Sequence, residues 1–414
     1  MQEVIKNKIT DFLRWSERYT GTDMVYAMKG GFWWILGKGG LAIISIGLLV
    51  AFSRLAPKEV FGTYQYIIAT AGLLAIFTLP GMDWALTRAI AKDKEGEFEK
   101  IAKEKIKWGS LAALGLFLIS GWYFINGNNI LGISFVIAGL IVPFLRTVEI
   151  FRFLWHGRAQ FRKLSLLEIL GNGLPIAIVI AVLFFTDNII YIILSWFAAN
   201  TFFKGLLYLY SRKKIKNQEE DRETIPFGKH MTLIQAFGLG ANQLDKIILW
   251  HFLGPVAVAV YSFAQLPVQK LQEFIPIAPL ALPKLSQKNV AEIKKPLLAK
   301  FRKLFLITTP AVLILILIAP LFYKVLFPQY LESVIYFQVL ALGLLFIPVS
   351  LLGTALITEL KTKELYKIRI ISPAVRILLY FILIPFLGLW GAVIAFLAEQ
   401  IINSALVFYY FKKI

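Results

Sequence analysis

Residues 211–230, SRKKIKNQEEDRETIPFGKH, form a highly charged segment at the middle of a 414-residue chain that is 58% hydrophobic. Six apolar stretches precede this segment and six follow it, and each is close to the roughly 20 residues that cross a bilayer as a helix. The mean hydropathy of +0.70 is well above that of soluble globular proteins. These features predict an all-α polytopic membrane protein with 12 transmembrane helices, arranged as two sets of six.

Basic residues fall in alternate gaps between the apolar stretches. These gaps hold 35 of the 44 Lys and Arg residues, whereas the intervening gaps hold only Arg54, Lys58 and Lys324. Because basic loops are retained on the cytoplasmic side, both termini are predicted to be cytoplasmic. The net charge of +19 then reflects loops that face anionic lipid headgroups, and no nucleic-acid partner is expected. The basic gaps are 1–30, 81–107, 151–165, 211–230, 284–303, 359–369 and 411–414, and the predicted helices are 31–53, 61–80, 108–126, 130–150, 166–186, 189–210, 231–253, 256–282, 304–323, 332–353, 368–387 and 390–410.

The two halves of the chain contain a matching connection. A shift of 198 residues places residues 253–255 (LGP) on residues 55–57 (LAP), where the first and second predicted helices of each set join. Since six is an even number, both sets enter the membrane from the same side, and transporters with parallel repeats tend to bind substrate between them. The predicted units are an amphipathic cytoplasmic segment at 1–30, an N-lobe at 31–210, a solvated cytoplasmic linker at 211–230 and a C-lobe at 231–414.

The sequence contains few groups suited to catalysis. It has no cysteine, and its three histidines, His156, His230 and His251, are far apart and form no zinc motif. It also has no Gly-rich phosphate-binding loop of the P-loop type. The predicted external gaps are too short for an external catalytic domain. We therefore expect a secondary transporter without catalytic residues, metal site or cofactor, with H⁺ and Na⁺ as candidate coupling ions.

Several segments resemble one membrane-protein family when they are read in order. They are residues 55–64 (LAPKEVFGTY), 158–165 (RAQFRKLS), 278–286 (APLALPKLS), 326–331 (LFPQYL) and 388–395 (GLWGAVIA). Together they resemble the oligosaccharide-lipid and polysaccharide (O-antigen-type) flippases of the multidrug/oligosaccharidyl-lipid/polysaccharide exporter superfamily. The resemblance implies two six-helix lobes in a V, alternating access, and a central path lined mainly by the first two helices of each lobe. The chain departs from the family at 186–189 (TDNI), which lacks the Gly-x-x-Gly-Ala connection.

Ionisable groups inside the predicted helices are candidate functional residues, because a charge at the bilayer centre costs about 2.5–3.5 kcal/mol on insertion scales. Lys38 lies between glycines that leave room for a bulky ligand, and Gln235, Asn242 and Lys246 share one face of their helix. The candidate substrate-binding residues are Lys38, Arg88, Gln235, Asn242, Lys246, Gln265, Gln269 and Lys270, and the candidate coupling residues are Asp245, Glu273, Arg376 and Glu399.

Each of these groups also has a structural interpretation. Lys38 could extend to the cytoplasmic headgroups, Arg88 could be a positive-inside anchor, and Lys204 is expected to extend to the interface. The amides could bond between helices instead of binding sugars. The candidate structural ion pairs are Asp245 with a basic residue, Arg146 with Glu149, and Arg376 with Glu399.

The sequence therefore favours a flippase that moves a polyprenyl-pyrophosphate-linked oligosaccharide from the cytoplasmic to the outer leaflet of a prokaryotic cytoplasmic membrane. Lys38, Lys246 and Lys270 would neutralise the pyrophosphate, and the amides would bind the sugars. Expected partners are the lipid-linked oligosaccharide, membrane lipids and other polysaccharide-assembly proteins. The alternatives are an ion-coupled multidrug or metabolite antiporter of the same superfamily, and then a membrane enzyme of glycan synthesis. The first is disfavoured by a basic rather than acidic intramembrane balance, and the second by the missing external loops.

Overall fold

The protein is built from helices. The computed structural model describes residues 24–274, 285, 290–359 and 362–413, and these contain no strand. Within this part of the chain, ten helices are long and apolar enough to cross a membrane, or up to eleven if a bent pair counts as one span. The prediction of an all-α, multi-pass membrane protein is confirmed. The helices are α2 (Met24–Leu55), α3 (Lys58–Leu74), α4 (Met82–Ala91), α5 (Glu97–Ile125), α6 (Asn129–Val148), α7 (Phe151–Gly157), α8 (Phe161–Phe185), α9 (Ile189–Arg212), α10 (Thr224–Phe274), α12 (Val290–Leu326), α13 (Ser333–Ala341), α14 (Val349–Thr358), α15 (Thr362–Leu387) and α16 (Leu389–Lys412).

Local sequence sets where several helices begin and break. Asn128 and Asn188 cap α6 and α9, since each side chain accepts a hydrogen bond from a backbone amide two or three residues later. Gly254 lies inside α10 with φ of 79°, a conformation that glycine adopts readily, so α10 consists of two helical segments that meet at this residue. The predicted helix 332–353 is bent by 43° between α13 and α14. Pro348 lies at this break and has no amide proton to continue a helix.

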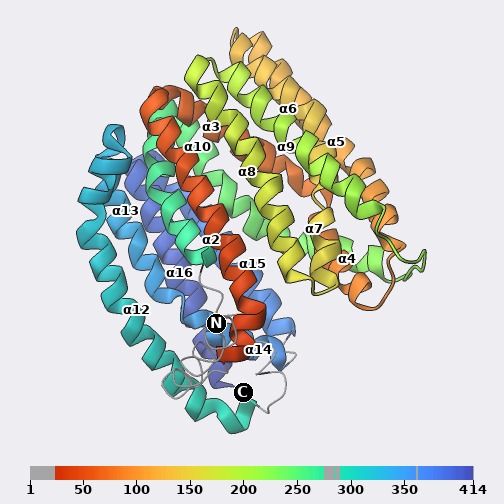
Figure 1. Cartoon of the computed structure of the whole chain (residues 1–414). Coiled ribbons are helices and arrows are strands. Elements are labelled where there is room, and N and C mark those ends of the chain that lie inside the picture. Colours follow the sequence, from red (N-terminus) through yellow and green to blue (C-terminus); the bar gives the residue numbers. More distant parts are fainter. Residues whose placement is uncertain (1–23, 275–284, 286–289, 360–361, 414) are drawn as a thin grey trace, which may run out of the picture.

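Two groups of helices flank a central contact. In one group α5 packs on α6, α6 on α9, α9 on α8, and α8 on α2; α5, α6 and α9 lie on the right of Figure 1. In the other, α12, α13 and α16 lie on the left, and α15 packs on α16. The two groups meet chiefly where α10 packs along α3.

The hydrophobic core is continuous at one end of the molecule and divided at the other. One buried cluster joins residues of α2 and α3 to residues of α10, α12, α13 and α16. The two remaining clusters are separate: one is built from residues 79–164 and the other from residues 285–411. The two halves of the chain therefore share a core at one end only.

An aromatic seam, defined as Phe61, Phe263 and Tyr330, closes the shared end. The ring centroids of Phe61 and Phe263 are 4.7 Å apart, and those of Phe263 and Tyr330 are 3.5 Å apart. Beside the rings, α3 crosses α10 so closely that a Cβ atom on Gly62 would overlap the carbonyl oxygen of Pro255. The residues of the seam come from the regions 54–64, 255–263 and 325–332, so we call this end the seam end.

The segment between the halves is largely exposed, and it is also bound to the first half. Glu95 accepts hydrogen bonds from the guanidinium of Arg158 at 2.8 and 2.6 Å and from the backbone amide of Lys216 at 2.6 Å. The carbonyl oxygen of Glu219 accepts a hydrogen bond from the amide of Gly96 at 2.9 Å. The prediction of a solvated linker at 211–230 stays a prediction, and the structure adds that the backbone of this exposed segment is hydrogen-bonded to the turn before α5.

The predicted amphipathic segment at 1–30 lies mostly outside the described residues. Residues 24–30 continue α2 without a break. Of the residues 278–286 that carry part of the family resemblance, only residue 285 is described. The prediction of two lobes at 31–210 and 231–414 stays a prediction, because the first turns of α10 also pack against α4, where the side-chain oxygen of Thr232 accepts a hydrogen bond from the amide of Gly81 at 3.0 Å.

Candidate functional site

A buried polar cluster links the two segments of α10. Lys246 Nζ donates to Gln265 Oε1 at 2.7 Å, and Gln265 Nε2 lies 2.7 Å from Asp245 Oδ2 and 2.9 Å from the hydroxyl of Tyr261. Asp245 is completely buried and also lies 3.4 Å from Lys246 Nζ. Because Lys246 and Gln265 are already bonded to one another, their polar atoms stabilise the contact between the two helical segments.

A second ion pair extends this cluster to α15 and α16. Arg376 Nη1 lies 2.9 Å from Glu399 Oε2, and Arg376 Nη2 donates to Asn242 Oδ1 at 2.6 Å. Arg376 is buried, whereas Asn242 is exposed on the side of α10 that faces a cavity. The structure shows the interhelical pair of Arg376 with Glu399, which is one of the two interpretations that the sequence left open.

The charges of the four ionisable residues in the extended cluster sum to zero. Asp245 and Glu399 supply two carboxylates, and Lys246 and Arg376 supply two cations. Removing one member of such a buried pair leaves an uncompensated charge, which is strongly unfavourable. The arrangement therefore has a structural use, whichever other role these residues have.

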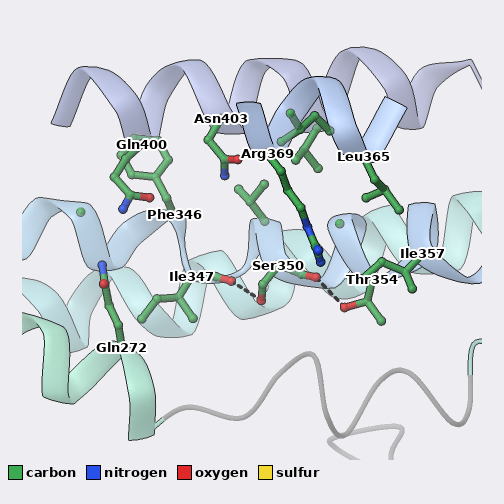
Figure 2. Close-up of a pocket in the computed structure, with 15 residues that line it drawn as sticks. Gln272, Phe346, Ile347, Ser350, Thr354, Ile357, Leu365, Arg369, Gln400 and Asn403 are labelled. Atoms are coloured by element: carbon green, nitrogen blue, oxygen red, sulfur yellow. Dashed lines mark hydrogen bonds between the residues drawn. The ribbon is translucent and has the colours of Figure 1, made fainter. Parts of the chain in front are cut away.

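Two cavities lie at the end opposite the aromatic seam, which we call the cavity end. The first has a volume of about 380 Å³ and is lined by α4, α10, α15 and α16, including Trp84, Gln235, Asn242 and Glu399. The second has a volume of about 450 Å³ and is lined mainly by α14, α15 and α16. Figure 2 shows the second cavity, with Gln272, Ser350, Thr354, Arg369, Gln400 and Asn403 drawn around it.

The two cavities meet at Ile368, Arg369 and Asn403, which line both of them. In Figure 2 the side chain of Arg369 extends from its helix toward Ser350 and Thr354. Arg369 makes no hydrogen bond or ion pair with the described residues. The sequence analysis missed this residue, because it counted Arg369 among the loop charges of 359–369. The signal that could have identified it is its spacing of seven residues from Arg376, which places both on one face of α15.

The first half of the chain has its own cluster of charges. Lys38 Nζ lies 3.5 Å from Glu168 Oε2, and Glu149 lies between Arg146 at 3.0 Å and Lys204 at 2.8 Å. The structural pair of Arg146 with Glu149 is confirmed. The expectation that Lys204 extends to the interface is wrong, because its side chain is buried and bonded to Glu149.

The other predicted site residues lie outside these clusters. Lys270 pairs with Glu273 at 2.9 Å, and Glu273 is largely exposed, so this is an i,i+3 pair on the surface of α10. Gln269 is half-buried and makes no hydrogen bond to the described residues. The guanidinium of Arg88 lies over the ring of Phe227 at 4.9 Å. The structure thus brings together Asn242, Asp245, Lys246, Gln265, Arg376 and Glu399, places Gln235 in the first cavity beside them, and leaves the other predicted residues apart.

Within the described ranges, no group of three or more His, Asp or Glu side chains is placed to hold a metal ion. The polar side chains that line the cavities are chiefly amides and hydroxyls. Such groups can donate and accept hydrogen bonds with polar ligands.

Comparison with known proteins gives a consistent family and fold. A family model described as polysaccharide biosynthesis protein matches residues 27–289. An uncharacterized membrane protein of Methanocaldococcus jannaschii is 22% identical over 417 residues, which covers 89% of this chain and 80% of the relative.

Solved structures share the fold at low sequence identity. The lipid II flippase MurJ in an inward closed conformation matches with a TM-score of 0.69 and 14% identity, over 90% of this chain and 85% of that chain. An inward-facing multidrug resistance MATE family transporter of the MOP superfamily matches with a TM-score of 0.63 and 14% identity, over 89% of this chain and 93% of that chain. The family resemblance found in the sequence is confirmed. Because the family model covers more than half of its residues, the chain belongs to the polysaccharide biosynthesis protein family and has the fold of the MOP superfamily transporters.

Proposed function

We propose that this protein is a flippase for a polyprenyl-pyrophosphate-linked oligosaccharide in a prokaryotic cytoplasmic membrane. The observation that carries the proposal is the first cavity, which lies between α4 of the first half and α10, α15 and α16 of the second, and whose polar lining includes the amides of Gln235, Asn242 and Asn403. A polar cavity between parallel repeats suits a hydrophilic head group that must cross the bilayer while its polyprenyl chain stays in lipid. The family of the chain and the fold that it shares with a lipid II flippase support this proposal.

The proposal includes twelve membrane crossings with both termini in the cytoplasm. Ten described helices are long and apolar enough to cross a membrane. Counting the two segments of α10 as separate spans adds one, and counting the bent pair α13–α14 as one span adds another, which gives twelve. The positive-inside rule then places the basic segments near the cavity end in the cytoplasm and the seam end outside. In this orientation the cavities face the cytoplasm, and the aromatic seam closes the outer side.

The topology can be tested because the chain contains no cysteine. Single cysteines at Arg222, in the segment between α9 and α10, and at Lys324, near the seam end, should react with a membrane-impermeant maleimide from opposite sides of the membrane. Labelling of both positions from the same side would contradict the proposed topology.

The membrane potential can supply the driving force for export. Moving one negative charge outward across a membrane that is negative inside gains about 2.3 kcal/mol per 100 mV. If H⁺ or Na⁺ resets the empty carrier, Asp245 and Glu399 are the buried carboxylates that would bind it. Such an ion would have to compete with Lys246 and Arg376, which already lie beside them.

A multidrug antiporter is the other candidate, since the chain also shares its fold with multidrug resistance transporters. A carrier of cationic drugs needs an accessible acidic group in its cavity. Glu399 is the only carboxylate among the described residues that line the two cavities, and Arg376 is bound to it. The flippase is therefore the better supported of the two.

Deletion of the gene tests the proposed function. Loss of a flippase should leave the lipid-linked oligosaccharide in the cytoplasmic leaflet, and the wild-type gene should restore its appearance in the outer leaflet. Asn242→Leu, which removes an amide from the first cavity, should restore it less well than Gln218→Leu, which alters an amide in the segment between α9 and α10. Normal appearance of the glycan outside the deletion strain, with altered drug sensitivity, would favour the antiporter instead.

A further inference from the structure

The cations expected to bind pyrophosphate are already engaged in the structure. Lys38 pairs with Glu168, Lys246 with Asp245 and Gln265, and Lys270 with Glu273. Binding an anion at any of them would require the existing partner to be displaced. Arg369 differs from all three, because it lines both cavities and makes no hydrogen bond or ion pair within the described part of the chain.

We propose that Arg369 is the anion-binding residue of this protein, and that it takes a phosphate or diphosphate group at the junction of the two cavities. The proposal rests on the proposed function only for the source of that group, a lipid-linked sugar. Guanidinium groups suit this chemistry, since their fork of N–H donors matches two phosphate oxygens at once.

The charges around Arg369 leave it available to an anion. The described lining of the second cavity contains no Asp or Glu. In the first cavity the lining carboxylate is Glu399, which is bound by Arg376. Neither cavity therefore offers a free carboxylate from the described residues that would neutralise Arg369.

The position of Arg369 along α15 separates it from the deeper charges. Arg369 and Arg376 are seven residues apart, so they lie on one face of the helix about 10 Å from each other along its axis. Arg376 is buried and neutralised, whereas Arg369 is exposed. An anion that enters from the cavity end thus reaches an unneutralised cation first and would meet the carboxylate of Glu399 only if it went deeper.

The side chains on either side of Arg369 suit the rest of a sugar-phosphate ligand. Gln272, Gln400 and Asn403 line the second cavity and make no side-chain hydrogen bond to the described residues, so their donors and acceptors are available. Ser350 and Thr354 donate their hydroxyl protons to backbone carbonyl oxygens at 2.7 Å, which leaves their oxygens as acceptors (Figure 2). Groups of this kind hydrogen-bond to hydroxyls, and Arg369 lies where the charged end of such a ligand would be held.

Binding of farnesyl diphosphate to the purified full-length protein in detergent tests the assignment. Isothermal titration calorimetry should give a dissociation constant that rises about tenfold or more in Arg369→Gln and less in Arg369→Lys, because charge-assisted hydrogen bonds to the phosphate are lost or reduced. The matched control is Arg222→Gln, which removes an exposed arginine far from the cavities in sequence and should bind like wild type. Farnesol, which lacks the diphosphate, should bind no differently to wild type and Arg369→Gln.

Competing ligands identify the source of the phosphate group. Displacement of farnesyl diphosphate by inorganic pyrophosphate, but not by phosphatidylglycerol, would show that the site takes a diphosphate head group. Displacement of farnesyl diphosphate by phosphatidylglycerol would show that the site takes the phosphate of a membrane lipid. Equal binding of farnesyl diphosphate to wild type and Arg369→Gln, when both melt at the same temperature, would overturn the assignment. A loss of farnesyl diphosphate binding in Arg222→Gln as large as that in Arg369→Gln would overturn it as well.

The assignment and the proposed function can fail separately. Arg369-dependent binding in a protein whose deletion leaves lipid-linked glycan export unchanged would retain the anion site and reject the flippase. Full restoration of export by Arg369→Gln in the deletion strain, together with unchanged binding, would retain the flippase and reject the site.

Discussion

The seam end and the cavity end share α10 but otherwise use different helices and different kinds of side chain. At the seam end, aromatic rings stack and Gly62 allows α3 to contact the backbone of α10. At the cavity end, the cavities are lined by amides, hydroxyls and Arg369 beside apolar side chains, and each half has its own hydrophobic core. Close apolar contact joins the halves at one end, and cavities with polar groups lie at the other; the proposed alternating-access carrier would require an asymmetry of this kind in one of its states.

The largest effect is expected from breaking the buried ion pair beside the first cavity. Arg376→Met leaves Glu399 without its cation, and it should lower the free energy of unfolding by about 3–5 kcal/mol, as for other buried pairs that lose one partner. Thermal unfolding in detergent measures the change. The double variant Arg376→Met/Glu399→Leu should be more stable than Arg376→Met, because it removes the uncompensated charge. Equal stability of the single variant and wild type would show that the pair does not hold α15 to α16.

A smaller loss is expected at the close crossing of the seam end. Gly62→Ala places a methyl group against Pro255 and should cost about 1–3 kcal/mol of stability, as overpacking of a tight contact does. The matched control is Gly47→Ala on α2, where an added Cβ has no described atom within 4 Å. Similar melting temperatures for the two variants would mean that the seam is looser than the structure indicates.

A still smaller effect is expected from the ion pair at the rim of the seam. Lys58 pairs with Glu332 across the two halves, and the two side chains are 30% and 51% exposed. Exposed pairs contribute about 0.2–1 kcal/mol. A double-mutant cycle with Lys58→Gln and Glu332→Gln should therefore give a coupling energy in this range that falls as salt is added. A coupling above about 2 kcal/mol would assign the closure of this end to charge rather than to the aromatic seam.

The contact between the first half and the segment that joins the halves, at the cavity end, should depend on pH. Burial opposes ionisation of Glu95, but hydrogen bonds from Arg158 and Lys216 outweigh it, so the pKa of this carboxyl lies below its ordinary value. A lowered pKa stabilises the folded contact above the ordinary value of about 4.5. That stabilisation is lost as the pH falls through the lowered pKa.

Hydrogen exchange measures this pH dependence. The protection factor of the Lys216 amide, corrected for intrinsic exchange, should fall below about pH 4.5 in wild type. Glu95→Gln should reduce protection at neutral pH and remove most of the acid dependence. An acid response that is unchanged in Glu95→Gln would assign the effect to another carboxylate.

The sequence predicted the class of fold and several local features correctly, because these depend on neighbouring residues. Hydropathy indicated a helical membrane protein, and the repeated residues 253–255 marked the break at Gly254. The pair of Arg146 with Glu149 followed from their i,i+3 spacing.

The error at Lys204 and the contacts that were missed concern partners that are distant in sequence. Lys204 bonds to Glu149, 55 positions away, and Glu95 bonds to Lys216, 121 positions away. Helical periodicity shows which face of a helix a side chain occupies, but not which helix packs against that face. Arg369 was overlooked for the same reason, since only the packing of α14, α15 and α16 turns this residue from a loop charge into part of a cavity.

Transport in proteoliposomes tests the central claim most directly. The purified protein would be reconstituted with a fluorescent polyprenyl-pyrophosphate-linked oligosaccharide, and a membrane-impermeant glycosidase would report how much of it reaches the outer leaflet. We expect translocation that requires the protein, is faster with a membrane potential negative inside, and slows in Asn242→Leu. Export of a cationic drug by the same vesicles, without translocation of the lipid-linked oligosaccharide, would contradict the flippase.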